Sequence, residues 1–206
     1  MRIGIDFDNT IARYDGVFAR LALALGLVEA VPQGGKQALR DRLRAQPEGE
    51  LQWQRLQALA YGPKLVEAEP FEGFQAFCQA AAGRGDQLYV VSHKTERAAL
   101  APDGPDLRRA AFDWLACHGF LSGEGGLRAE RVFFEDTRAA KLARIGGLGV
   151  ECFVDDLEEV LLEPAFPATV EGLLFDPHGK ANGSGLRRFG SWHELAGYLG
   201  YAAGRS

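Results

Sequence analysis

The 206-residue sequence predicts an α/β fold built on a doubly wound parallel sheet, and two observations support that prediction. Several short runs consist almost entirely of apolar residues, as expected of strands that are covered on both faces. Segments of helical periodicity separate these runs, and strands that alternate with helices favour right-handed crossovers between parallel strands. The length suffices for one core with a smaller appendage.

The five predicted strands cover residues 3–5, 88–91, 132–134, 152–154 and 173–175. A helix is expected where Leu107, Ala111, Trp114 and Leu115 share one face, and Gly119 follows as a stop signal. The final helix opens on Ser191 and Glu194, three residues apart, which is the spacing of a capping box.

The first gap between strands is much longer than a crossover requires. About 80 residues separate the first two apolar runs, and they contain helical patterns at 16–26, 36–45 and 50–61. A further helix at 71–82 then serves as the crossover. We therefore expect a helical insertion over 15–66, with a core formed by 1–14 and 67–206.

Composition restricts the classes of partner. The formal net charge of −5 argues against a nucleic-acid polymer, which requires a basic surface. No apolar run approaches the roughly 20 residues of a membrane span, and the first strand follows the initial Met at once. The three cysteines, Cys78, Cys117 and Cys152, are odd in number and widely spaced. We expect a cytoplasmic protein without membrane partners. The sequence does not decide whether the protein is a monomer or a dimer.

Polar residues that can carry chemistry follow the apolar runs. Asp6 and Asp8 come directly after the first strand, and alternate side chains of a strand share a face. Ser92 follows the second strand, and Lys141 lies in the helical segment after the third. Asp155 and Asp156 follow the fourth strand. Open α/β sheets place their sites at the carboxyl ends of strands, so these residues are candidates for one site. Two neighbouring carboxylates repel unless a cation or a proton separates them.

These residues resemble the four ordered motifs of the haloacid dehalogenase-like (HAD) hydrolase superfamily. The resemblance covers residues 3 to about 160: Asp6-Phe7-Asp8-Asn9-Thr10, then Ser92, then Lys141, then Asp155-Asp156. It implies a HAD-like Rossmannoid core, and the helical insertion is similar to the small cap that some phosphatases of this superfamily carry after the first motif. The first motif is highly specific, whereas the second and third are single residues that gain weight from their positions.

The resemblance implies a metal-binding phosphatase. Asp6 would be the nucleophile that forms an aspartyl phosphate, and Asp8 the general acid and then the general base. Magnesium would be held by the Asp6 carboxylate, the Asp8 carbonyl and a carboxylate of the Asp155-Asp156 pair. By the family pattern Asp156 is the direct ligand, with Asp155 binding directly or through water.

A second group of residues would hold the phosphoryl oxygens. The resemblance assigns this role to Ser92 and Lys141, with Asn9, Thr10 and His93 beside them. Lys141 would also offset the charge of the carboxylates, since phosphoryl transfer depends mostly on positioning and charge stabilisation.

The acid at position 8 indicates the reaction. Family members that cleave carbon–halogen bonds or phosphonates generally lack an acid there. A halide leaves without a proton, whereas the alkoxide that leaves a phosphate ester needs one. The expected substrate is a small phosphorylated metabolite, such as a sugar phosphate or nucleotide. Candidates for its recognition are charged or aromatic residues around the insertion and beside Ser92: Arg13, Tyr14, Arg20, Lys64, His93 and Lys94.

Three alternatives stay open at this point. A phosphotransferase or phosphomutase would use the same residues but pass the phosphoryl group to a hydroxyl. A phospho-receiver signalling domain also combines acids, Mg²⁺, a hydroxyl and a lysine, and Asp136 would then be its acceptor. A non-catalytic binding protein is the third alternative, although a complete set of acids argues against it.

Overall fold

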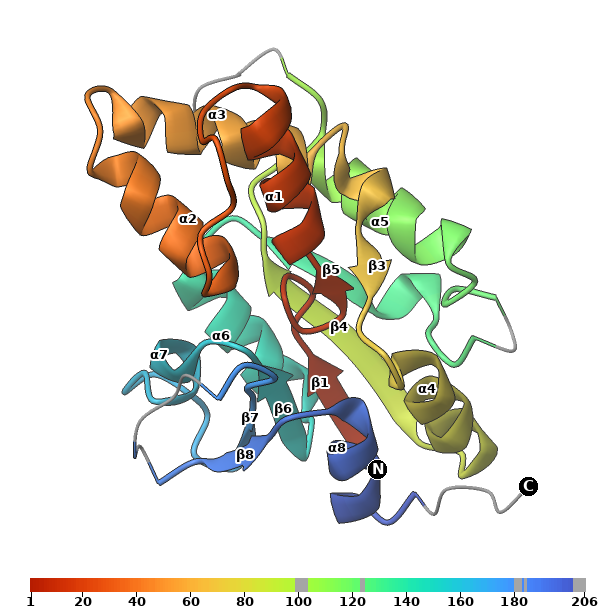
Figure 1. Cartoon of the computed structure of the whole chain (residues 1–206). Coiled ribbons are helices and arrows are strands. Elements are labelled where there is room, and N and C mark those ends of the chain that lie inside the picture. Colours follow the sequence, from red (N-terminus) through yellow and green to blue (C-terminus); the bar gives the residue numbers. More distant parts are fainter. Residues whose placement is uncertain (99–103, 123–124, 180–182, 184, 202–206) are drawn as a thin grey trace. The chain divides into compact units, whose positions relative to one another are not determined.

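Six parallel strands form the main sheet of the computed structural model, which describes residues 1–98, 104–122, 125–179, 183 and 185–201 (Figure 1). The strands are β1 (Arg2–Ile5), β4 (Gln87–His93), β5 (Val132–Glu135), β6 (Cys152–Asp155), β7 (Glu171–Phe175) and β8 (Arg187–Phe189). The predicted α/β class and doubly wound parallel sheet are confirmed, and the five predicted strands all form. The sixth, β8, is an edge strand that the sequence pattern did not indicate.

The strand order defines where a site can form. It runs β5-β4-β1-β6-β7-β8, so β1 lies between β4 on one side and β6 on the other. Along the chain, β4 and then β5 are added on one side of β1, and β6, β7 and β8 follow on the other side. The direction of addition therefore reverses between β1 and β6. In open α/β sheets such a switch point is where ligands bind, at the carboxyl ends of the strands. Asp6 and Asp155 stand at this point.

Helices cover both faces of the sheet. On one face α6 (Arg138–Leu148) and α7 (Glu158–Leu161) pack on a cluster that includes Leu142, Phe153, Val160 and Leu174. On the other, α4 (Phe74–Gly83) and α8 (Trp192–Tyr198) pack with aromatic rings: Phe77 and Phe175 lie 4.8 and 5.4 Å from the Trp192 ring. Leu174 and Phe175 are consecutive in β7 and therefore point to opposite faces.

The N-termini of α6 and α8 are fixed by side-chain caps. The hydroxyl of Thr137 accepts a hydrogen bond from the Ala140 amide at 3.1 Å, and that of Ser191 accepts one from the Glu194 amide at 3.2 Å. The second confirms the capping pattern read at Ser191, although Glu194 bonds back to the amide of Gly190 rather than to that of Ser191. Capping at Thr137 fixes the first turn of the helix that carries Lys141.

The chain forms two compact units. The first comprises Met1–Ala12, Pro70–Lys94 and Leu115–Ser206, and contains the sheet; the second comprises Arg13–Glu69 and Thr95–Trp114. The chain passes between them through two short strands, β2 (Ala12–Arg13) and β3 (Glu69–Pro70), and again at 94–95 and 114–115.

The second unit is helical. It contains α1 (Asp15–Ala24), α2 (Gly35–Arg44), α3 (Gly49–Tyr61), the short 3₁₀ helix Leu65–Glu67 and most of α5 (Leu107–Cys117). Rings fill its centre: Phe18 stacks on Trp53 with centroids 5.0 Å apart, and Tyr61 meets Phe18 edge-on at 5.6 Å. These buried aromatic surfaces give the unit its own core.

The helical unit is larger than the insertion expected over 15–66. It also takes in 95–114, because Trp114 of α5 donates a hydrogen bond through Nε1 to the Ala68 carbonyl at 2.9 Å. Leu107, which is also in α5, packs close to Gly62: a Cβ on Gly62 would lie 3.2 Å from Leu107 Cδ2. These contacts join segments that are far apart in the sequence.

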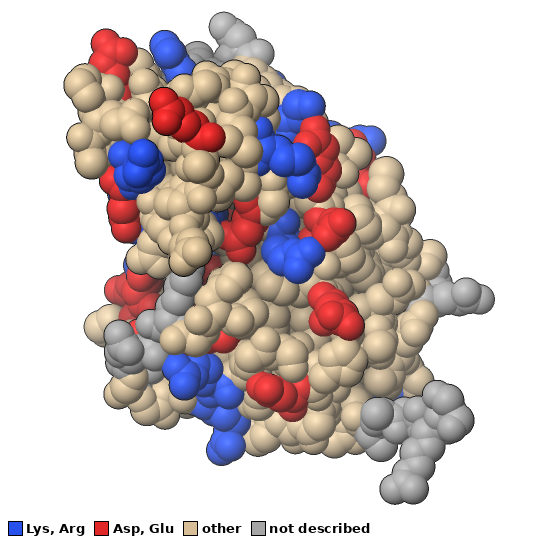
Figure 2. All heavy atoms as spheres, viewed as in Figure 1, with Lys and Arg blue, Asp and Glu red and all other residues tan. Residues whose placement is uncertain are grey.

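The surface carries charges of both signs in close proximity. Figure 2 shows basic and acidic side chains interspersed on the visible face, without a continuous basic stripe. Within the described ranges, no helix combines the length and the apolar character needed to cross a membrane.

Candidate active site

Asp6 stands at the end of β1, inside the sheet. Its amide donates to the Val154 carbonyl at 2.8 Å, which extends the β1–β6 ladder one residue beyond Ile5. The residue is only 5% exposed. A carboxylate in such a place loses most of its hydration and therefore requires other polar partners.

Lys141 of α6 is such a partner, and Asp6 shares it with a second acid from β6. The Lys141 ammonium donates to Asp6 Oδ1 and to Asp155 Oδ2, both at 2.6 Å, and all three side chains are buried. Asp155 Oδ1 in turn accepts from the Leu157 amide at 2.9 Å, which fixes the turn after β6. Residues from three segments of the chain thus meet in one buried ion cluster.

A glycine in β1 makes room for this cluster. Gly4 pairs with Phe153 across the β1–β6 ladder, and a Cβ on Gly4 would lie 2.4 Å from the Phe153 ring. The ring sits 5.3 Å from the Lys141 ammonium, where its face stabilises the cation. The Gly in Ile3-Gly4-Ile5 therefore allows the packing that supports Lys141.

Burial and charge shift the pKa values of this cluster. Burial raises the pKa of Asp6 to about 6; Lys141 opposes the rise, while Asp155 and Asp8 add to it. Burial lowers the pKa of Lys141, but Asp155 and Asp6 outweigh it and hold that pKa above its usual value. One ammonium does not fully compensate the carboxylates around it, so the charged form of Asp6 is destabilised.

The acids form a group that can hold a cation. Asp6, Asp155 and Asp156 each offer a carboxylate oxygen, and these oxygens all lie within 4.8 Å of one another. Opposite ligands of Mg²⁺ are about 4.2 Å apart, given metal–oxygen distances near 2.1 Å. The spacing and the all-oxygen donor set therefore fit magnesium, and the added positive charge would lower the raised pKa of Asp6.

The turn after Asp6 orients the next residues of the motif. The amides of Ile11 and Ala12 both donate to the Phe7 carbonyl at 3.0 Å, and Asn9 adopts a left-handed conformation with φ of 58°. Asn tolerates this conformation better than most residues do. Asp8 thus lies in a tight turn rather than on a continuing strand, and the strand alternation used to place it beside Asp6 ends at Ile5.

Asp8 has its own lysine. The Lys94 ammonium lies 3.0 Å from Asp8 Oδ1 and 2.9 Å from Oδ2, and the Lys94 side chain is only 3% exposed. Lys94 follows the end of β4, and the sequence indicates it only as a candidate for substrate recognition. The sequence does not indicate this pair, because the two residues are 86 positions apart and no local pattern connects them.

Ser92 and His93 occupy the end of β4 but differ in exposure. Ser92 is buried beside β5, paired in register with Phe134, whereas His93 is exposed and its Nε2 lies 3.0 Å from the Asp136 carbonyl. Thr10 is fully buried; its carbonyl accepts from Trp192 Nε1 at 3.1 Å, and its hydroxyl has no partner among the described residues. The phosphate contacts expected of Ser92, Asn9, Thr10 and His93 stay predictions.

Most recognition candidates of the helical unit are engaged within that unit. Arg13 pairs with Glu69 at 2.6 Å, and Lys64 pairs with Glu67 at 2.7 Å. Arg20 donates to the Glu67 carbonyl at 3.1 Å. Tyr14 is buried against the Phe18 and Tyr61 rings. These contacts are those of ordinary structural residues, and a role in recognition stays a prediction.

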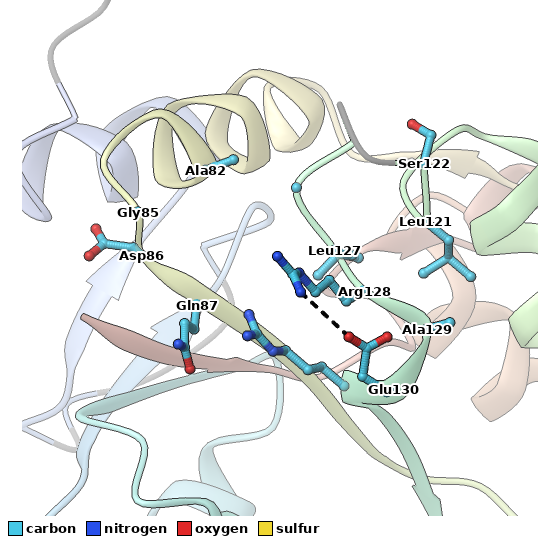
Figure 3. Close-up of a pocket in the computed structure, with 12 residues that line it drawn as sticks. Ala82, Gly85, Asp86, Gln87, Leu121, Ser122, Leu127, Arg128, Ala129 and Glu130 are labelled. Carbon is cyan, nitrogen blue, oxygen red and sulfur yellow. Dashed lines mark ion pairs between the residues drawn. The ribbon is translucent and has the colours of Figure 1, made fainter.

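A cavity of about 500 Å³ lies at the other edge of the same sheet (Figure 3). It is lined by residues just before β4 and β5 and at the start of β4, including Asp86, Gln87, Arg128 and Arg131. Arg128 pairs with Glu130 at 3.8 Å within it. Because parallel strands share one direction, this cavity is at their amino ends and the acid cluster is at their carboxyl ends.

The strand order does not fit the receiver alternative. Receiver-type doubly wound sheets have the order 2-1-3-4-5, in which the first strand adjoins the third. Here β4 separates β1 from β5, the strand that precedes Asp136. An acceptor at Asp136 would follow a strand that is not adjacent to the one ending at Asp6.

Known proteins share this fold. No protein-family model matches the sequence, and no curated protein matches it either. Solved structures are similar to it over nearly the whole chain, and three of them illustrate the range. The HAD-hydrolase YfnB from Bacillus subtilis, bound to magnesium, has a TM-score of 0.59 at 12% identity and covers 97% of this chain and 98% of its own.

The other two carry different activities in their names. A HAD phosphatase from Thermococcus onnurineus has a TM-score of 0.53 at 14% identity, covering 97% of this chain and 98% of its own. A dehalogenase with an intermediate complex has a TM-score of 0.59 at 14% identity, covering 96% of each chain. The structural neighbours are consistently HAD-superfamily hydrolases, and the chain has their Rossmannoid fold.

Proposed function

We propose that the protein is a magnesium-dependent phosphatase of the HAD type, which hydrolyses a small phosphorylated metabolite through an aspartyl phosphate. The observation that carries this proposal is the buried cluster in which Lys141 bridges Asp6 and Asp155 at the switch point of the sheet. Structural ion pairs do not require a cluster in which acids outnumber the cation. Perturbed carboxylates of this kind are typical of functional sites.

In the first step Asp6 attacks phosphorus in line with the leaving oxygen. A bond forms between an Asp6 carboxylate oxygen and phosphorus, the ester P–O bond breaks, and Asp8 gives its proton to the departing oxygen. In the second step Asp8 takes a proton from water, whose oxygen bonds to phosphorus as the bond to Asp6 breaks. Inorganic phosphate leaves, and both carboxyl groups return to their initial states.

The metal would be held by Asp6, the Asp8 carbonyl and Asp156, with Asp155 binding directly or through water. The oxygen spacing of 4.8 Å or less supports this assignment. Four carboxylates face two ammonium groups in this region, so a divalent cation would balance the charge. When bound, Mg²⁺ neutralises and orients the phosphoryl oxygens.

The phosphoryl group would be held chiefly by Ser92 and Lys141. Two N–H groups of Lys141 are used by Asp6 and Asp155, and an ammonium has a third that can donate to a phosphoryl oxygen. Ser92 is supported by its position at the carboxyl end of β4, the neighbour of β1. Asn9, Thr10 and His93 complete the proposed set, and substrate binding would have to uncover the Thr10 hydroxyl.

The helical unit would act as the cap that selects the substrate. Its separate aromatic core supports a unit that keeps its own structure. A cap of this size suits a small metabolite, such as a sugar phosphate or nucleotide, in the cytoplasm. A phosphotransferase or phosphomutase would use the same residues, and release of inorganic phosphate without an acceptor distinguishes hydrolysis from both.

Dehalogenases are among the structural neighbours, and Asp8 separates the two chemistries. An alkoxide leaving group needs a proton, whereas a halide does not. The acid at position 8 therefore favours phosphate esters over carbon–halogen bonds.

Phosphate release tests the proposal. We expect Mg²⁺-dependent hydrolysis of p-nitrophenyl phosphate, its loss in EDTA, and its recovery when Mg²⁺ is returned. Asp6→Asn should lower the rate by at least about 10³-fold, because the nucleophile is removed. A panel of phosphorylated metabolites then identifies the substrate class. Normal turnover by Asp6→Asn, or hydrolysis unaffected by EDTA, would refute the proposal.

A further inference from the structure

Two buried lysines contact different carboxylates of the site. Lys141 contacts Asp6 and Asp155, whereas Lys94 contacts Asp8. Burial of an ammonium costs several kcal/mol, so a second one in the same region calls for an explanation. The roles proposed above use Lys141 and leave Lys94 without one.

The contact between Lys94 and Asp8 fixes the direction of the carboxylate. The ammonium lies 3.0 Å from Oδ1 and 2.9 Å from Oδ2, so it contacts both oxygens at once. A cation placed against both oxygens restricts rotation about the bond to the carboxyl group, which a contact to one oxygen would not. Asp8 is the more exposed partner, with 22% of its side chain accessible, and so would otherwise have more freedom.

Lys94 is itself held in place from two directions. Its amide donates to the Glu135 carbonyl at 2.9 Å, which continues the β4–β5 ladder beyond His93. Its ammonium lies 5.5 Å from the centre of the Phe7 ring, and Phe7 is fully buried and packs edge-on against Phe134. Lys94 is therefore a rigid support and not a flexible surface side chain.

Resting on the function proposed above, we propose that Lys94 is the positioning residue for proton transfer: it holds the Asp8 carboxyl group in the orientation from which it gives its proton to the leaving oxygen and then takes one from water. Proton transfer by a positioned side chain accelerates a reaction by about 10²–10⁴-fold, and it requires hydrogen-bond distance to the leaving atom. Misplacement by an ångström would cost a large part of that factor.

The choice of leaving group tests this role selectively. An alkyl phosphate needs a proton on its departing oxygen, whereas p-nitrophenolate leaves with little assistance. Lys94→Met should lower kcat/KM for an alkyl phosphate by about 10²-fold. For p-nitrophenyl phosphate the same variant should lower kcat/KM by no more than about ten-fold. The comparison uses kcat/KM, because this constant reports the steps up to the formation of the aspartyl phosphate. A purely structural role for Lys94 would lower both values equally.

A double-mutant cycle gives a second readout. If Lys94 acts through Asp8, Lys94→Met should cause no further loss in the Asp8→Asn background, since residues that work as a unit are not additive. Arg109→Met, which breaks an exposed ion pair with Asp113 on α5, is the matched control and should leave both esters unaffected. Full additivity in the cycle would overturn the proposal.

The outcome is separable from that of the proposed function. Wild-type phosphate release decides whether the protein is a phosphatase, and the ratio of the two esters decides the role of Lys94. Circular dichroism checks that each variant folds; if Lys94→Met does not fold, Lys94→Gln replaces it, because it keeps a polar side chain but removes the cation that contacts both oxygens of Asp8. Equal losses on both esters in a folded variant would show that Lys94 does not position Asp8.

Discussion

Two aspartates stand at opposite ends of the strands of one sheet, and their surroundings shift their pKa values in opposite directions. Asp6 lies at the carboxyl edge, and burial raises its pKa to about 6 despite the contact with Lys141. Asp86 precedes β4 at the amino edge. Burial opposes its ionisation too, but hydrogen bonds from the amino terminus and from Tyr201 outweigh burial and lower its pKa.

The difference lies in how many donors each carboxylate receives. Asp86 is bonded by the Met1 amino group and by the Tyr201 hydroxyl at 2.7 Å, and Arg84 lies 3.5 Å away. Asp6 shares a single ammonium with Asp155 and has further acids beside it. A satisfied acid stabilises the fold, whereas an acid that lacks compensation is ready to bind a cation or to attack an electrophile.

The largest expected change in stability follows removal of the shared ammonium. Lys141→Met leaves Asp6 and Asp155 buried without a cation, and breaking a buried pair in this way costs about 3–5 kcal/mol. We expect this loss in the free energy of unfolding at neutral pH without metal, measured by urea denaturation. Arg144→Met, on the same helix but paired with Glu135 at the surface, is the control and should cost less than about 1 kcal/mol. Equal effects would contradict the assignment of Lys141.

A smaller loss is expected at the other edge. Asp86→Asn weakens hydrogen bonds to a charged acceptor and should destabilise the fold by about 1–3 kcal/mol. Because the folded pKa of Asp86 lies below its unfolded value, the contribution is present above the unfolded pKa and is lost as the pH falls through the folded pKa. Turnover should stay within about two-fold of wild type, since Asp86 is remote from the chemistry. A large loss of kcat with an intact fold would contradict this view of Asp86.

The smallest expected change in stability is an increase, and it follows the substitution of Asp6. The folded pKa of Asp6 is raised from 3.8 to about 6, so the folded state binds the proton more tightly than the unfolded state does. The ionised Asp6 therefore destabilises the metal-free fold above pH 6, and this cost disappears as the pH falls from 6 towards 4. Asp6→Asn should raise the Tm at pH 7.5 by roughly 2–4 °C, the shift that about 1 kcal/mol gives in a chain of this size.

Two further thermal measurements complete this test. At pH 4 the Tm difference between wild type and Asp6→Asn should shrink, because Asp6 is then protonated in the folded state. Magnesium should raise the Tm of the wild type more than that of the variant. A lower Tm for Asp6→Asn at pH 7.5 would show that Asp6 is a satisfied structural acid like Asp86.

Local patterns in the sequence were sufficient for most of the fold. The five central strands are apolar runs that need no knowledge of distant residues, and helix α8 carries its own cap at Ser191. Strand β8 was missed because it is a short edge strand with two exposed arginines before Phe189. The crossover helix begins at Phe74 instead of near residue 71, because Gly73 adopts a left-handed conformation at its N-terminus.

The site was less accessible to sequence reasoning, because it depends on contacts between distant segments. The residues of the four motifs were identified by type and order, but the geometry among them was not. Nothing local indicates that Lys94 contacts Asp8 or that Lys141 bridges Asp6 and Asp155. The same holds for 95–114, which joins the helical unit through a hydrogen bond between Trp114 and Ala68.

The most direct test of the central claim is to trap the covalent intermediate. The wild-type protein is mixed with Mg²⁺ and p-nitrophenyl phosphate, quenched in acid and treated with borohydride, which reduces an acyl phosphate to the alcohol. Peptide mass spectrometry then locates the reduced residue. We expect reduction at Asp6, dependent on the ester and absent in EDTA. Reduction at Asp136 or at another carboxylate, or turnover without any trapped residue, would contradict it.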